Sequence, residues 1–109
     1  MKAMQIVNFD GPASGLRYQE ASTPEPGPGQ IAVDVDHAGV GYVEALFTEG
    51  LVPIDLPWTP GLEVSGRVRA LGDGVDGYRL GDAVVALTIT GGGGYGQVAV
   101  APADLVTPL

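Results

Sequence analysis

The sequence contains no cysteine and only one histidine, His37. Without cysteine, these residues cannot form disulfides, thiolate zinc sites or iron–sulfur clusters, and they offer no cysteine nucleophile. One histidine also excludes a metal site built from several imidazoles within this chain, and any histidine-based catalysis would have to use His37. The lack of cysteine suits a reducing compartment, so we expect a cytoplasmic protein.

Basic residues and long apolar runs are also scarce. Five Lys and Arg stand against 13 Asp and Glu, which gives a formal net charge of -8. That charge repels phosphate backbones, and the five cations are too scattered to form a basic stripe, so we expect no nucleic-acid partner. No run of about 18 consecutive apolar residues occurs, and we therefore expect no membrane span.

The length of 109 residues corresponds to a single domain over 1–109. Short segments of alternating polar and apolar residues, separated by glycine, proline and aspartate, are typical of an all-β barrel or sandwich. In residues 63–71, for example, Val64 and Val68 fall on one face and Arg67 and Arg69 on the other. Strands are predicted at 2–8, 17–21, 30–37, 63–71, 83–88 and 96–101. Residues 83–88 are apolar on both faces, which predicts a strand covered on each side.

Only residues 42–49 carry a helical pattern, with three apolar residues at helical spacing and Gly50 as the stop. Residues 51–61 contain three prolines and are predicted to be irregular. Residues 22–29 (STPEPGPG) lie between predicted strands, so we interpret them as a stiff surface loop rather than a domain boundary.

Gly91, Gly93 and Gly96 satisfy the spacing G-x-G-x-x-G of a dinucleotide-binding loop. A true fingerprint needs a following helix whose N-terminus receives the pyrophosphate. Here residues 97–101 (QVAVA) continue as a predicted strand. We therefore interpret the glycines as a hairpin loop and not as a cofactor site.

The polar candidates are few. His37 lies at the end of a strand beside Asp34 and Asp36, and a solvated face explains these three residues better than a cation site does. Glu63 opens the strand 63–71 and shares its face with Arg67 and Arg69. We therefore expect Glu63 to be structural, in an ion pair that orders a turn.

Three aromatic residues lie beside glycines or prolines in irregular segments: Tyr42, Trp58 and Tyr95. Aromatic side chains in such places line a pocket for a flat ligand or fill the core. The pattern favours neither interpretation.

Taken together, the motifs resemble a known superfamily. Residues 60–75 (PGLEVSGRVRALGDGV) and 78–84 (YRLGDAV) are similar to the P-G-x-E-x-x-G-x-V-x-x-x-G-x-G-V-x-x-[FY]-x-x-G-D-x-V pattern of the medium-chain dehydrogenase/reductases. Residues 38–44 (AGVGYVE) and 95–106 resemble two further segments of that superfamily. The resemblance covers essentially the whole chain. It implies the N-terminal catalytic domain, a GroES-like, partly open β-barrel with one or two short helices.

Departures from the pattern indicate the branch. The zinc-dependent alcohol dehydrogenases have a cysteine at the position of Gly41 and a histidine at that of Leu62, so this chain lacks both catalytic zinc ligands. It also lacks their cysteine-rich structural zinc lobe. The resemblance is therefore to the zinc-independent branch, the quinone oxidoreductases and enoyl reductases that use NADPH. That branch has an asparagine near the nicotinamide ribose where this chain has Gly41. The superfamily's dinucleotide-binding domain follows where this sequence stops, and nothing within residues 1–109 replaces it.

The resemblance implies the substrate-pocket half of an NADPH-dependent, zinc-independent oxidoreductase. Its acceptor would be an already electrophilic quinone or α,β-unsaturated carbonyl, because no zinc is expected to polarise it. The expected roles are Gly41 and Tyr42 for cofactor binding, Tyr42 also for proton delivery, and Leu46, Trp58 and Leu62 for the substrate pocket. An enoyl reductase domain of a polyketide or fatty-acid synthase ranks below a quinone oxidoreductase-like protein, because residues 39–44 match its pattern poorly.

The alternative is a stand-alone GroES-like barrel that serves as a non-enzymatic binding or assembly module. Exposed strand edges would then favour a homo-oligomer. If the chain is instead part of a two-domain reductase, residues 1–109 alone are expected to be inactive, because the cofactor is bound mainly by the other domain.

Overall fold

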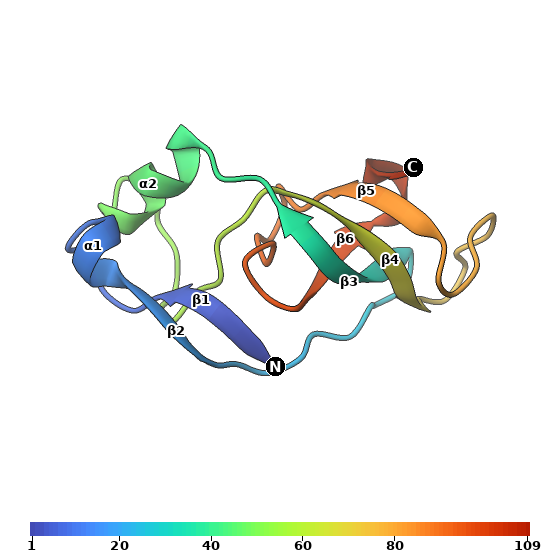
Figure 1. The fold of residues 1–109 in the computed structure, drawn as a ribbon, viewed down its shortest axis with the longest axis horizontal. Helices are drawn as coiled ribbons and strands as arrows, with labels where there is room; N and C mark the ends of the chain where they lie inside the picture. The colour runs from blue at the N-terminus through green and yellow to red at the C-terminus, as the bar shows by residue number, and fades with distance from the viewer.

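The computed structural model describes all of residues 1–109 and confirms a mainly β protein. Five antiparallel strands form one sheet in the order β6-β3-β4-β5-β7, which curls into a half-barrel, and β1 and β2 form a separate two-stranded ribbon (Figure 1). The elements in chain order are β1 (Lys2–Ile6), α1 (Pro12–Gly15), β2 (Leu16–Glu20), β3 (Gln30–Ala38), α2 (Tyr42–Thr48), β4 (Glu63–Leu71), β5 (Ala83–Leu87), β6 (Val98–Pro102), a 3-10 helix (Ala103–Leu105) and β7 (Val106–Pro108).

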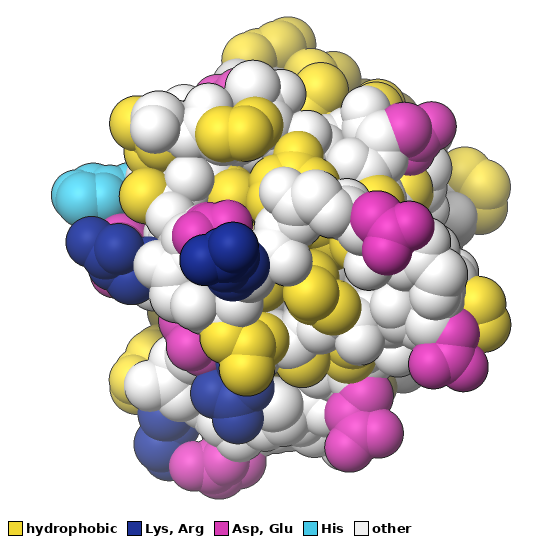
Figure 2. All heavy atoms as spheres, turned by 90° about the vertical axis from the view of Figure 1, so that its right-hand side faces the viewer, with side chains coloured by type: hydrophobic (Ala, Val, Ile, Leu, Met, Phe, Trp, Pro, Cys, Tyr) yellow, Lys and Arg dark blue, Asp and Glu magenta, His cyan; other side chains and the backbone are white.

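The molecule is elongated, with a longest extent of 42 Å. Both α-helices lie at one end, beyond the β1–β2 ribbon, and the half-barrel forms the other end (Figure 1). Figure 2 views the barrel end: acidic side chains are spread over both halves of that face, whereas basic side chains gather on one half. Neither α-helix is long and apolar enough to cross a membrane.

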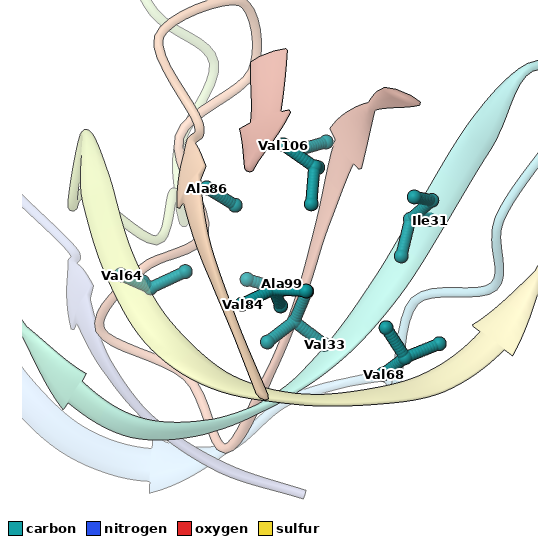
Figure 3. Packing of buried hydrophobic residues seen from close by; sticks show 9 residues of the cluster. Ile31, Val33, Val64, Val68, Val84, Ala86, Ala99 and Val106 are labelled. Carbon is teal, nitrogen blue, oxygen red and sulfur yellow. The ribbon is translucent and has the colours of Figure 1, made fainter. Parts of the chain in front are cut away.

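The core fills the concave side of the curled sheet. Side chains from β3, β4, β5, β6 and β7 point toward one another there, mostly valine and alanine (Figure 3). Val33, Val84 and Ile31 have no exposed surface at all. Burying a side chain of this size stabilises the fold by roughly 1.5–3 kcal/mol. The alternation of β4 follows the prediction, with Val64 and Val68 inside and Arg67 and Arg69 outside.

The register of β3 changes at Asp36. Val35 is opposite Gly66 and His37 is opposite Ser65, so Asp36 has no partner on β4. Such a bulge moves the next side chain to the other face of the strand. His37 is therefore exposed on the outer face beside Ser65, as the interpretation of a solvated residue required.

The prediction that the strand at 83–88 is covered on both sides is wrong. Val84 and Ala86 of β5 are buried, but Val85 is 41% exposed and Leu87 is 39% exposed. The half-barrel has its core only on the concave side. Within this chain nothing packs over the convex face of β5, although its residues there are apolar.

Several boundaries also differ from the prediction. The single turn α1 was not anticipated, because four residues carry no helical period; Gly11, at φ +84°, and Pro12 start it. The strand β7 was also missed. Residues 22–29 and 51–61 are without regular helix or strand, as predicted.

Candidate functional site

Residues 39–41 form a short loop, the 39–41 loop, that joins the end of β3 to the start of α2. The backbone N–H of Gly41 donates a hydrogen bond to Oε2 of Glu44 at 3.0 Å, which caps the first turn of α2. This cap fixes where the helix begins. The loop and helix start present two large side chains to solvent, Val40 at 85% and Tyr42 at 79% exposure.

Glu63 holds the other end of the same loop. Its backbone carbonyl accepts a hydrogen bond from the N–H of Gly39 at 3.0 Å. Its carboxylate lies against the Cα of Gly39, so that a Cβ at this position would collide with Oε1 of Glu63. A larger residue at position 39 would therefore push the exposed Glu63 side chain away from the loop. The 39–41 loop is thus flanked by two carboxylates, one at each end.

The predicted ion pair between Glu63 and the arginines of its own strand is wrong. Arg69 instead pairs with Asp34 of β3 at 2.9 Å, and Arg67 donates to the carbonyl of Gly81. Along one strand, Glu63 and Arg67 are four residues apart, or about 13 Å. Asp34 lies opposite Arg67 and diagonally from Arg69, and such neighbours are only about 5–8 Å apart, so Asp34 is closer to these arginines than Glu63 is.

Hydrogen bonds join the segment before Glu63 to residues 91–96, the glycine-rich loop. The carbonyl of Gly61 accepts hydrogen bonds from Oγ1 of the buried Thr88 at 2.6 Å and from the N–H of Gly94 at 3.2 Å. The N–H of Tyr95 donates to the carbonyl of Pro60 at 2.9 Å. No helix follows these glycines, because the chain continues into β6. This confirms that the G-x-G-x-x-G spacing is a structural loop.

Tyr95 lines the same hollow as Val40 of the 39–41 loop. Burial raises the pKa of its phenol above 10.0, and the negative charge of Glu44 raises this pKa further. Tyr95 therefore stays protonated at neutral pH. This hollow of about 400 Å³ lies between the β1–β2 ribbon and the end of β3, and its remaining walls are Lys2, Met4, Tyr18, Val35, Ala38, Gly94, Gly96 and Gln97.

The structure brings only some of the predicted site residues together. Gly41 and Tyr42 are neighbours at the start of α2. Trp58 packs on Phe47 of α2, with ring centroids 4.7 Å apart, and lines a different hollow of about 460 Å³ beside the glycine-rich loop. Tyr42, Leu46 and Leu62 line none of the five main hollows.

The sequence reasoning missed Glu44 as a site residue. Glu44 is only 7% exposed, although it is charged. The signal was its position three residues after Gly41, where the acid of a capping box stands. No group of three or more histidine, aspartate or glutamate side chains lies close enough together to hold a metal ion.

Residues 27–109 match the model of the alcohol dehydrogenase GroES-like domain. The chain belongs to this family. Two similar curated proteins are a probable quinone oxidoreductase of Schizosaccharomyces pombe, 35% identical over 102 residues, and the quinone oxidoreductase of Sus scrofa, 34% identical over 109 residues. The two alignments cover 93% and 97% of this chain, but 30% and 32% of the relatives.

Solved structures give the same result. The human synaptic vesicle membrane protein VAT-1 homolog-like protein superposes with a TM-score of 0.93 at 32% identity, over 100% of this chain and 34% of that one. A mycobacterial protein in complex with NADPH superposes with a TM-score of 0.87 at 32% identity, over the same shares of each chain. The GroES-like domain thus spans about a third of the length of these relatives. The expected likeness to the N-terminal domain of quinone oxidoreductase-like medium-chain dehydrogenase/reductases is confirmed.

Proposed function

We propose that this GroES-like domain is the substrate-pocket half of a zinc-independent, NADPH-dependent oxidoreductase that reduces quinones or α,β-unsaturated carbonyls in the cytoplasm. The observation that carries the proposal is the exposed, apolar rim formed by Val40, Tyr42 and Val43. The rim stands on a loop whose two ends are fixed by Glu63 and Glu44. A rigid loop that displays bare apolar side chains is suited to form one wall of a binding site.

The similar proteins support this assignment. Two of them are named quinone oxidoreductases, and another similar protein has been solved with NADPH. The alternative of a stand-alone, non-enzymatic barrel is not favoured by these names. Because residues 1–109 cover only about a third of such proteins, we propose that the domain by itself is inactive.

The residues at the 39–41 loop fit one end of a nicotinamide cofactor. Apolar Val40 and the exposed ring of Tyr42 suit an uncharged nicotinamide ring, and the exposed Gly41 places no side chain between them. The loop is flanked by the carboxylates of Glu44 and Glu63, and no Lys or Arg pairs with either of them. The cofactor's phosphates therefore need a binding site elsewhere.

When bound, the nicotinamide cofactor supplies a hydride to the acceptor. Gly41 and Leu62, at the positions of the zinc ligands in other branches, have no metal-binding side chain, so the acceptor must already be electrophilic. Tyr42 is the proton donor in this proposal. Its hydroxyl makes no hydrogen bond within the chain and is exposed, so it is free to donate its proton to the reduced acceptor. Leu46, Trp58 and Leu62 are proposed to contact the acceptor and exclude water.

The test is kinetic and uses the complete protein encoded by the gene, after its reading frame has been followed past codon 109. Tyr42→Phe should lower kcat for quinones and enones by about 10²-fold, the contribution typical of a general acid. Trp58→Ala should raise KM. Tyr78→Phe, at a tyrosine whose hydroxyl bonds the carbonyl of Val106 and which lines none of the five main hollows, is the matched control and should change neither value.

Unchanged turnover of every quinone and enone by both Tyr42→Phe and Trp58→Ala would show that the pocket assignment is wrong. If the complete protein had no affinity for NADPH but assembled into a defined homo-oligomer, the enzyme proposal itself would fall, and a binding or assembly module would take its place.

A further inference from the structure

Glu44 is a buried carboxylate without a cation. Its side chain is only 7% exposed, and it takes part in no ion pair. Oε2 accepts the N–H of Gly41, whereas Oε1 accepts no hydrogen bond. Because no buried side-chain oxygen is left without a partner, Oε1 must reach the surface of the molecule. The cap of α2 uses only Oε2, so Oε1 is left facing the surface beside the 39–41 loop.

Glu63 adds a second negative charge at the same loop. Its carboxylate lies against Gly39, two residues from Gly41. A hollow of about 280 Å³ opens beside it, and the only other titratable side chain that lines this hollow is His37. Glu44 and Glu63 therefore lie on opposite sides of the exposed Val40.

The cations of the chain do not neutralise these carboxylates. Lys2 lines the hollow of about 400 Å³, but its ammonium group is bound to Glu20 at 3.1 Å, and the N-terminal amine also pairs with Glu20. Arg69 is paired with Asp34, and Arg67 is bonded to a backbone carbonyl. The two remaining arginines, Arg17 on β2 and Arg79 before β5, form no ion pair.

The charge of Glu44 already acts on a neighbour. It raises the pKa of the Tyr95 phenol, in addition to the larger effect of burial. Such an effect means that a second negative charge near the 39–41 loop is disfavoured.

We propose that Glu44 and Glu63 select acceptors by charge, so that the site takes neutral quinones or enones and rejects analogues with an anionic group close to the reacting ring. This inference rests on the proposed oxidoreductase function and specifies its substrate class. Like charges brought together in a partly desolvated site repel strongly enough to exclude a wrong partner. For a separation of about 8 Å and an effective dielectric constant of about 40, each carboxylate contributes roughly fivefold discrimination.

The experiment measures kcat/KM of the complete protein with NADPH for 1,2-naphthoquinone and for its 4-sulfonate. The ratio of the two values, neutral over anionic, is compared between variants, so that the different reactivities of the two quinones cancel. Glu44→Gln and Glu63→Gln should each lower the ratio by roughly fivefold. In the Glu44→Gln variant the amide oxygen can still accept the N–H of Gly41, so the cap is kept. Glu25→Gln, at an exposed carboxylate in the 22–29 loop, should leave the ratio unchanged.

A second measurement needs no variant. Raising the salt concentration from about 0.01 M to about 1 M shortens the screening length from about 30 Å to about 3 Å, so the ratio of the wild-type protein should fall. The proposal is overturned if neutral quinone is turned over but the ratio responds neither to salt nor to Glu44→Gln and Glu63→Gln. If neutral quinone is not turned over with NADPH at all, the proposed function is wrong, and the charge selection falls with it.

Discussion

Gly61 and Gly94 cross backbone to backbone. A Cβ atom at Gly61 would lie 2.6 Å from the Cα of Gly94 and 2.7 Å from the N of Tyr95. Gly61 also has a φ of +109°, which side chains rarely adopt. This crossing joins the segment before β4 to the glycine-rich loop, and it holds the start of the strand that carries Glu63.

Gly61→Ala should therefore destabilise the protein by about 2–4 kcal/mol, because strain at positive φ adds to a collision with backbone that cannot move aside. The free energy of unfolding in urea checks this. Gly74→Ala is the matched control: Gly74 has a φ of +82° but open space around its Cα, so only the backbone term of about 1–2 kcal/mol should remain. Equal costs for the two variants would contradict the close crossing.

Tyr78 ties the last strand to the barrel. Its hydroxyl donates a hydrogen bond to the carbonyl of Val106 at 2.8 Å. Tyr78→Phe should cost about 1 kcal/mol and increase amide hydrogen exchange in β7 and at Leu109, whose N–H donates to the carbonyl of Ala83. Tyr18→Phe removes an exposed hydroxyl without a partner, and it should change neither stability nor exchange.

Val84 and Val85 test which side of β5 is covered. Val84 is fully buried and Val85 is 41% exposed. Val84→Ala should lower the free energy of unfolding by about 2 kcal/mol, since a cavity remains in a packed core. Val85→Ala should cost less than about 1 kcal/mol. If the two costs were equal, residues 1–109 would bury both faces of this strand, contrary to the structure.

The pKa of Tyr95 provides a test of its position beside Glu44. Because the folded-state pKa is raised above 10.0, Tyr95 contributes stability that is present below pH 10 and is lost as the pH rises through the folded value. Tyr95→Phe should therefore reduce the loss of unfolding free energy above pH 10. Glu44→Gln should lower the pKa only in part, because burial is the larger cause, and the ultraviolet absorbance of the phenolate reports it. An unchanged pKa would place Glu44 too far away to act.

Much of the fold could be predicted from local patterns. A period of two identifies a strand whenever one face is buried, which is why the β4 segment was found with its correct inward residues, Val64 and Val68. The same reasoning failed for β5, because apolar residues on both faces do not show which face has a neighbour. α1 has too few residues to show any period.

Some residues of the candidate site could likewise be predicted from neighbouring sequence, and others could not. Gly41 and Tyr42 are predicted to be site residues from a motif of adjacent residues, and the structure places them together at the start of α2. Glu44 and Tyr95 were not connected, because they are 51 positions apart in the sequence, and only the path of the chain brings them together. The expected partners of Glu63 were wrong because the cross-strand neighbour of an arginine depends on strand pairing.

The sequence by itself determined the mainly β class, the turns, the buried alternation and the family motifs, since each depends on residues close together in the chain. Only the tertiary structure brings the backbones of Gly61 and Gly94 into contact and pairs Asp34 with Arg69. It also places Glu44 and Glu63 at the two ends of one exposed loop. Contacts of this kind depend on how strands pair and how the sheet curls. These in turn follow from packing of the whole core, which no local pattern encodes.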